Sequence, residues 1–329
     1  VTVAALGLVA LLLLTAAGAD ASTPQERRAA EAGEFDRVYA QFQGWFLGEH
    51  DEHGTSYAHW RFQDLRATGD ATTSGTAAPG TDAVRRIDTE TDYARMGRGR
   101  DVTVLRRDRL SRPGFSLDYL HPGGTDVDYV LIGERYRRPV QLDPRLPARP
   151  LWPTLWMARP TTMSQGWDPC ATGGTALFCD LDTAVAATRA AIPDVPRSYH
   201  RSPDGAVTAR TAIRFYDLII YDIAPTNARQ LAQLQPAFTT LIPLTITFDS
   251  AGRFVRAELN GRLATDGAVL EVQLGIERHG TATAADFPAP PSNPDEITHA
   301  NHLDAYVFAQ EASDLSDRES AGEDESPPR

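Results

Sequence analysis

Apolar and polar residues alternate along the last third of the chain, as in strands with one buried and one wet face. The pattern predicts a hairpin over 242–261, a strand over 267–279 and a long strand over 205–222. The hairpin tip 249–252 (DSAG) has the composition of a tight turn, because Gly tolerates positive φ and Asp bonds its own backbone. The predicted inward positions are Val207, Ala209, Ile213, Phe215, Ile242, Leu244, Ile246, Phe248, Val255, Ala257, Leu259, Leu270, Val272, Leu274 and Ile276.

The first half of the chain shows shorter runs of the same kind, separated by Gly- and Pro-rich breakers. A helix is predicted over 25–48, where Phe35, Val38 and Phe42 recur at helical spacing. Further strands are predicted over 56–68, 83–96, 100–109, 114–120 and 126–137, and further helices over 180–192 and 225–235. Strands spaced in this way favour antiparallel pairing over strand–helix–strand units.

The segment 139–160 differs from its surroundings, because prolines punctuate it throughout. Such proline density blocks a strand or a long helix. We expect a connector with at most a short helix, whose bulky residues Trp152, Leu155, Trp156 and Met157 pack on another part of the protein.

These elements predict an α+β fold. A sheet with one apolar face must cover that face, and few helices are available for so many strands. We expect a strongly curved antiparallel sheet that wraps around its own apolar side, with helices over the concave side or the mouth. Such a half-barrel leaves an internal cavity if it is wide enough.

The two ends of the sequence differ from this body. Residues 3–19 are apolar and precede Ala19-Asp20-Ala21, a small-x-small pattern, so 1–21 is interpreted as a signal peptide or an N-terminal anchor. Residues 22–300 are expected to form one domain, and 301–329 a helix end followed by an acidic, disordered tail. The predicted location is extracytoplasmic, secreted or membrane-anchored.

Composition narrows the function classes. The formal net charge is −12, and residues 303–329 carry eight acidic residues against two arginines. Nucleic-acid binding requires a basic footprint, which is missing here. All 32 basic residues counted as Lys or Arg are arginine, which excludes a Schiff-base lysine and a phosphate-loop lysine.

The chain has two cysteines, Cys170 and Cys179. In an exported protein they favour a disulfide, which closes the loop 168–180. A metal site needs further ligands close by, and the loop contains none. We therefore expect no metal and no cofactor.

Three patterns suggest chemistry, and each has a simpler interpretation. LFCDLDTA (177–184) resembles the DxDGT signature of haloacid dehalogenase-like phosphatases, but the Gly is missing, so a helix start with Asp180 or Asp182 near the cap is favoured. The pairs His50/His53 and His299/His302 have no third metal ligand in sequence. Asp88, Glu90 and Asp92 alternate on one strand face, as expected for a wet face opposite arginines such as Arg106. No catalytic residue is predicted.

The C-terminal half resembles the LolA-like envelope proteins, in the order PTNARQLAQLQ, PLTITF, DSAGRF, VRAEL, VLEVQLGIER and FPAPP. The actinobacterial LprG and LppX lipoprotein group has the most similar hairpin, D-x-x-G-R-x-x-R, which Asp249, Gly252, Arg253 and Arg256 match. The lipobox cysteine of that group is absent. The similarity covers roughly 205–291 well.

This resemblance implies a cavity that holds acyl chains or lipidated partners, with the segment around Trp152 and Trp156 closing its mouth. The expected lining is Trp152, Leu155, Trp156, Ile213, Phe215, Leu244, Ile246, Phe248, Val255, Leu270, Val272 and Leu274.

Three functions follow for testing. The first is a lipid carrier or sensor of the cell envelope, with a lipid or acylated molecule, an envelope protein or a membrane surface as partner. The second is an exported scaffold or regulator whose barrel is filled and which acts through protein contacts. The third and weakest is a hydrolase that uses the strand carboxylates.

Overall fold

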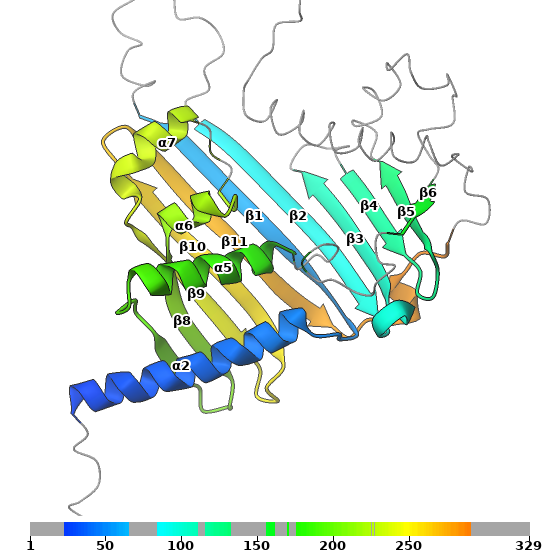
Figure 1. Ribbon diagram of the computed structural model, residues 1–329, viewed down its shortest axis with the longest axis horizontal. Coiled ribbons are helices and arrows are strands. Elements are labelled where there is room, and N and C mark those ends of the chain that lie inside the picture. The colour runs from blue at the N-terminus through cyan, green and yellow to red at the C-terminus, as the bar shows by residue number, and fades with distance from the viewer. Residues whose placement is uncertain are drawn as a thin grey trace, which may run out of the picture.

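The computed structural model describes residues 23–65, 84–110, 116–132, 156–161, 170, 176–224, 226 and 228–290. Within these residues, one antiparallel sheet of eleven strands carries helices on one face (Figure 1). The α+β class and the antiparallel pairing are therefore confirmed. The predicted segments 1–21 and 301–329 lie outside the described residues.

The sheet is open, because its first and last strands each pair on one side within the described part of the chain. Strands that are consecutive in sequence are neighbours, except β6 and β7, which lie at opposite edges of the sheet. At the centre, β1 pairs with β11, so the first and last of the described strands along the chain are neighbours. In sheet order the strands are β6 (Met157–Pro160), β5 (Val127–Ile132), β4 (Ser116–His121), β3 (Thr103–Leu110), β2 (Val84–Met96), β1 (Glu52–Asp64), β11 (Ala268–Gly280), β10 (Phe254–Ala264), β9 (Leu241–Phe248), β8 (Val207–Arg214) and β7 (Ser198–Arg201).

The helices lie over the half of the sheet that runs from β1 to β8 (Figure 1). They are α2 (Pro24–Leu47), α5 (Ala176–Ala191), α6 (Phe215–Ile220) and α7 (Ala228–Leu234), with 3-10 turns η2 (Gly99–Asp101), η3 (Gln235–Ala237) and η4 (Ala284–Asp286). We call the helix-covered side of the sheet the inner face and the opposite side the outer face. None of the described helices combines the length and apolarity that a membrane span requires.

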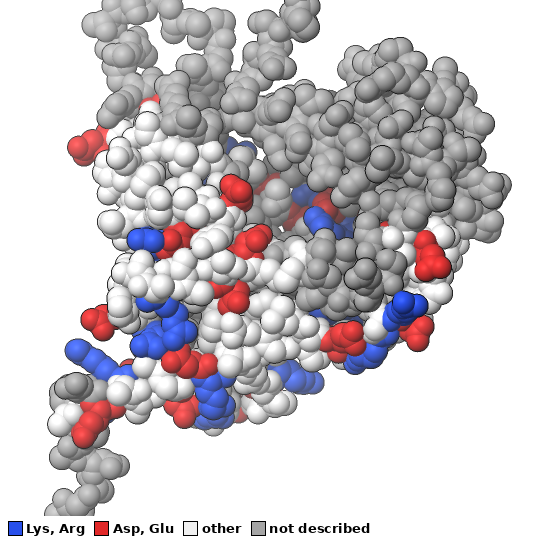
Figure 2. Space-filling model, in the orientation of Figure 1, with Lys and Arg blue, Asp and Glu red and all other residues white. Residues whose placement is uncertain are grey.

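Helix α2 begins at a capping box: the Thr23 hydroxyl accepts from the Glu26 backbone N–H, and the Glu26 carboxylate accepts from the Thr23 backbone N–H. Its apolar stripe packs onto the sheet and is almost fully buried. The stripe consists of Phe35, Val38, Tyr39, Phe42, Trp45 and Phe46. Charged side chains of both signs surround α2, whereas the surface around α7 is largely uncharged (Figure 2).

One hydrophobic core fills the space between the helices and the inner face. Alternation along β9 and β11 places every second side chain there, as the sequence predicts. A smaller cluster lies on the outer face, where Ala94, Leu105 and Leu120 share one cross-strand row. The segment after β11 covers this row with Ala282 and Phe287.

Three sequence expectations were wrong in detail. The long strand ends at Arg214, and Phe215 begins α6, because a short apolar run does not distinguish strand from helix. The proline-rich connector contains strand β6, which tolerates Pro160 because it lies at the sheet edge. Helix α5 begins at Ala176, so Asp180 and Asp182 lie within the helix and not near its cap.

Candidate functional site

Most of the expected cavity-lining residues lie in the core, each at most 2% exposed. They are Ile213, Phe215, Leu244, Ile246, Phe248, Leu270, Val272 and Leu274. Around them, side chains from α2, α5, α6 and α7 occupy the space under the helices; Phe42, Phe178 and Leu218 are each at most 1% exposed.

The other expected lining residues do not join this core. Strand β10 has a bulge between Phe254 and Arg256, so Phe254 faces inward and is 2% exposed, and Val255 is displaced from the buried set. Trp156 packs on the outer-face cluster, away from the helices. Trp152 and Leu155 lie outside the described residues.

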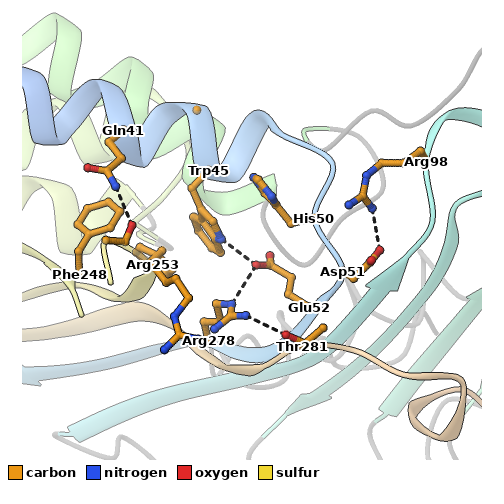
Figure 3. A pocket seen from close by; sticks show the side chains of 13 residues that line it. Gln41, Trp45, His50, Asp51, Glu52, Arg98, Phe248, Arg253, Arg278 and Thr281 are labelled. Atoms are coloured by element: carbon orange, nitrogen blue, oxygen red, sulfur yellow. Dashed lines mark hydrogen bonds and ion pairs between the residues drawn. The ribbon is translucent and has the colours of Figure 1, made fainter. Parts of the chain in front are cut away.

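A pocket of about 460 Å³ opens where the C-terminal end of α2 meets the β9–β10 turn and the ends of β1 and β11 (Figure 3). Its lining comes from four separate parts of the sequence. The lining residues are Gln41, Gly44, Trp45, His50, Asp51, Glu52, Arg98, Phe248, Gly252, Arg253, Phe254, Arg278 and Thr281.

One wall of the pocket is aromatic. The Trp45 and Phe254 rings stack with centroids 3.7 Å apart, and Phe248 meets Phe254 edge-on at 5.9 Å. Stacked and edge-on rings bury large apolar area in a fixed geometry. This wall joins the pocket to the hydrophobic core, of which all three rings are members.

The adjoining wall is a buried charge cluster centred on Glu52, which is 0% exposed. Its Oε1 accepts from Arg95 Nη2 at 2.8 Å, and its Oε2 accepts from Trp45 Nε1 at 2.7 Å. Arg278 approaches the same Oε2 with its Nε at 3.6 Å. A buried carboxylate is tolerated only with such partners.

Arg278 is held less tightly than Arg95. Besides the 3.6 Å approach of its Nε to Glu52, its Nη2 donates to Thr281 Oγ1 at 3.4 Å. Its side chain is 19% exposed, and it lines the pocket. A guanidinium has five N–H donors, so Arg278 retains donors for an anionic group in the pocket.

The rim is fixed by contacts between loops and strands. Gln41 Nε2 on α2 donates to the Gly252 carbonyl at 2.7 Å, which ties the helix to the β9–β10 turn. Asp51 accepts from the Gly97 backbone N–H and from Arg98, and these bonds lower the pKa of Asp51. Within the turn, Asp249 accepts from the Arg253 backbone N–H and side chain, which lowers its pKa.

The structure also places the candidate chemical groups. Asp182 accepts from Tyr39 Oη at 2.7 Å and from Gln43 Nε2 at 2.9 Å, a helix-to-helix contact. Burial, and then the Asp222 charge, raise the pKa of Asp180. His50 lines the pocket, whereas His53 Nδ1 lies 3.8 Å from Asp286. His299 and His302 lie outside the described residues.

Asp88, Glu90 and Asp92 share the outer face with arginines, as expected for a wet face. Asp92 pairs with Arg109, and Asp88 with Arg86. Arg106 was misassigned to that face: it opposes Tyr93 on the inner face and donates to Asp108. The Cys170–Cys179 disulfide is present, with an S–S distance of 2.04 Å.

Sequence reasoning missed Glu52, Arg95 and Arg278 as site residues. A signal exists for two of them, because Glu52 and Arg95 are opposite charges at inward positions of adjacent strands. Finding that signal requires the register between β1 and β2, which lies beyond single-sequence periodicity.

Comparison with known proteins adds little to this geometry. No known family matches the chain. No curated protein matches it either. Among solved structures, a LolA superfamily protein from Nitrosomonas europaea aligns over 78% of this chain and 95% of its own, at 9% identity and a TM-score of 0.19. A likeness this low carries no argument, and none of these comparisons points to the LprG and LppX group.

Proposed function

We propose that this chain is an extracytoplasmic binding protein for an amphiphile, a lipid or an acylated partner, whose acidic end lies in the pocket at the end of α2. The carrying observation is the meeting of the Trp45–Phe254 wall with the Arg278–Glu52 cluster in one pocket of about 460 Å³. The Cys170–Cys179 disulfide supports an oxidising compartment.

The two walls have different roles in this proposal. The rings of Trp45, Phe248 and Phe254 contact the apolar part of the ligand. Arg278 and Thr281 donate to its carboxylate or phosphate, because a guanidinium forms charge-assisted hydrogen bonds with such groups. Pockets of 300 to 1,000 Å³ are typical of small-molecule sites, so this one holds a head group and the first part of a chain.

The apolar surface of α6 supports contact with a membrane, from which such a ligand would come. Tyr216 is 39% exposed and Ile220 is 53% exposed. Large apolar side chains that are exposed together favour protein or membrane contact.

The test is titration of the full chain with dodecanoate and, separately, with dodecanol, followed by calorimetry and tryptophan fluorescence. We expect dodecanoate to bind and to change the tryptophan fluorescence of the chain, because Trp45 lines the pocket. Arg278→Gln should weaken dodecanoate binding about tenfold, the value of one charge-assisted hydrogen bond, and leave dodecanol binding unchanged. Arg37→Gln, an exposed arginine on α2, is the matched control.

Two results would contradict the proposal. One is the absence of binding by either amphiphile. The other is equal affinity for dodecanoate in the parent chain and in Arg278→Gln, which would separate the pocket from the binding.

A second function is favoured by a specific observation. Eight of the residues that the sequence predicts to line a cavity are at most 2% exposed in the core, and side chains from the helices pack over them. A filled interior suits an exported scaffold or regulator that acts through protein contacts. This alternative predicts no bound amphiphile at any concentration below micelle formation.

A further inference from the structure

A second concave site lies on the outer face, across the four central strands β2, β1, β11 and β10. It is a groove of about 650 Å³. The strand register aligns two transverse rows of side chains in it. The first row is Arg86, Arg61, Glu271 and Arg262, and the second is Asp88, His59, Gln273 and Asn260.

The first row contains a local conflict. Arg61 and Arg86 are direct cross-strand partners, and like charges at such positions destabilise a sheet. Asp88 partly offsets this repulsion, because its Oδ2 lies 2.7 Å from Arg86 Nε. The Glu271 carboxylate is shared by two arginines: Arg61 Nη1 lies 3.3 Å from its Oε2, and Arg262 Nε lies 3.7 Å from its Oε1. Local choices that oppose stability are typical of functional sites.

Charge in the groove is opposite in sign to that of the protein. Its lining carries three arginines against Glu271 and Asp88, whereas the whole chain has a formal net charge of −12. The arginine side chains are 55 to 71% exposed. Their guanidinium groups are therefore accessible to an anion, and Arg is suited to phosphate and carboxylate because its planar fork binds them bidentately.

The second row supplies neutral hydrogen-bonding groups beside the arginines. Gln273 Nε2 donates to Glu258 at 3.2 Å, which leaves the Gln273 carbonyl oxygen as an acceptor. Asn260 is exposed and makes no hydrogen bond to another described side chain. His59 Nδ1 lies 3.1 Å from Asp88 Oδ1, so the hydrogen bond to Asp88 leaves the Nε2 of His59 available for a ligand. These groups match hydroxyls, which both donate and accept.

A flat ring surface borders this row. The Tyr57 and His59 rings lie 5.4 Å apart at an interplanar angle of 20°. Tyr57 extends across Gly275, where a Cβ would lie 2.7 Å from Tyr57 Oη. Glycine at this position therefore keeps the ring flat against the sheet.

We propose that this groove binds a saccharide that carries a phosphate or carboxylate. The anion lies over the Arg61–Arg86–Arg262 row, and the sugar hydroxyls contact Asn260, Gln273 and His59. The site is on the opposite face from the pocket at α2 and does not depend on the proposed function.

The test is calorimetric titration of the full chain with glucose 6-phosphate, glucose, inorganic phosphate and glucuronate. We expect glucose 6-phosphate to bind at least tenfold more tightly than glucose or phosphate. Arg61→Gln should weaken it at least tenfold. Asn260→Ala should weaken glucose 6-phosphate binding and leave phosphate binding unchanged. Arg109→Gln, an arginine outside the groove lining on the outer face, should have no effect.

Glucuronate is a free sugar acid, and polygalacturonate is a polymer of sugar acids that carry the same kind of carboxylate. Comparing them with glucose 6-phosphate distinguishes a free sugar acid or sugar phosphate from an anionic envelope polymer as the ligand. Tighter binding per repeat of the polymer assigns the groove to a polymer, and preference for glucose 6-phosphate assigns it to a free sugar phosphate. The proposal is overturned if no probe binds, if phosphate alone binds as tightly as glucose 6-phosphate, or if Arg109→Gln loses as much affinity as Arg61→Gln.

Discussion

Substitution of Glu52 by Gln tests the charge cluster on which the pocket rests. Glu52 is 0% exposed, and its carboxylate holds Arg95, which is 2% exposed, at 2.8 Å. Removing one charge of a buried pair costs about 3 to 5 kcal/mol. Trp45 can still donate to the Gln amide oxygen, so we expect a loss at the lower end, about 3 kcal/mol in the free energy of unfolding.

The assay is urea unfolding followed by tryptophan fluorescence, since Trp45 and Trp60 are buried. With an m value of about 3 kcal/mol/M, the midpoint should fall by about 1 M. Glu34→Gln, which loses an exposed ion pair with Arg37, should change stability by less than about 0.5 kcal/mol.

A double-mutant cycle adds Arg95→Met to Glu52→Gln. The two changes should couple by about 2 kcal/mol, because Arg95→Met removes the guanidinium whose buried carboxylate partner Glu52→Gln has already removed. A loss below about 1 kcal/mol for Glu52→Gln, or additive effects in the cycle, would refute the cluster as a stabilising unit.

Three further changes test other parts of the account. Replacing Cys170 and Cys179 by Ser should lower stability by about 2 to 3 kcal/mol in the chain-entropy model for a loop of separation 9, and an unchanged urea midpoint would contradict this. Thr188→Val removes a buried donor 2.6 Å from Asp217 Oδ2 and an acceptor for the Arg214 backbone N–H, so we expect a loss of about 2 kcal/mol by the same assay. Burial and Asp222 raise the pKa of Asp180, so folding favours the protonated carboxyl. The resulting contribution to folding stability is fully present below the pKa of the unfolded chain and is lost as the pH rises through the raised pKa of the folded chain. Asp180→Asn should therefore raise the free energy of unfolding by a few tenths of a kcal/mol at pH 7 and leave it unchanged in acid. An unchanged free energy of unfolding at pH 7 would count against the burial argument.

The sequence predicted much of this fold where apolar alternation was long and regular. The hairpin of β9 and β10 is an example, because Leu244, Ile246 and Leu259 fall on one face with no competing pattern. Periodicity predicted that Val255 faces inward, but Phe254 does so instead. This difference was not predictable, because a β-bulge adds one residue to the strand and reverses which side chain faces the core. The strand prediction for Phe215 was wrong for a different reason, because the apolar run FYDLII is equally consistent with a short helix.

The candidate sites were mostly beyond the sequence. Trp45, Glu52 and Arg278 come together only because β1 pairs with β11, a contact between distant parts of the chain. The arginine row of the outer groove likewise requires three strand registers at once. Periodicity indicates which face a residue occupies, but not which residues of other strands lie beside it.

Native mass spectrometry of the purified full chain tests the central claim, a bound amphiphile, most directly. The spectrum is recorded after gentle purification, after extraction of lipids, and after addition of dodecanoate. The account predicts an added mass that extraction removes and dodecanoate restores, with weaker restoration in Arg278→Gln. A single unliganded mass in all three samples would contradict it and favour the filled scaffold.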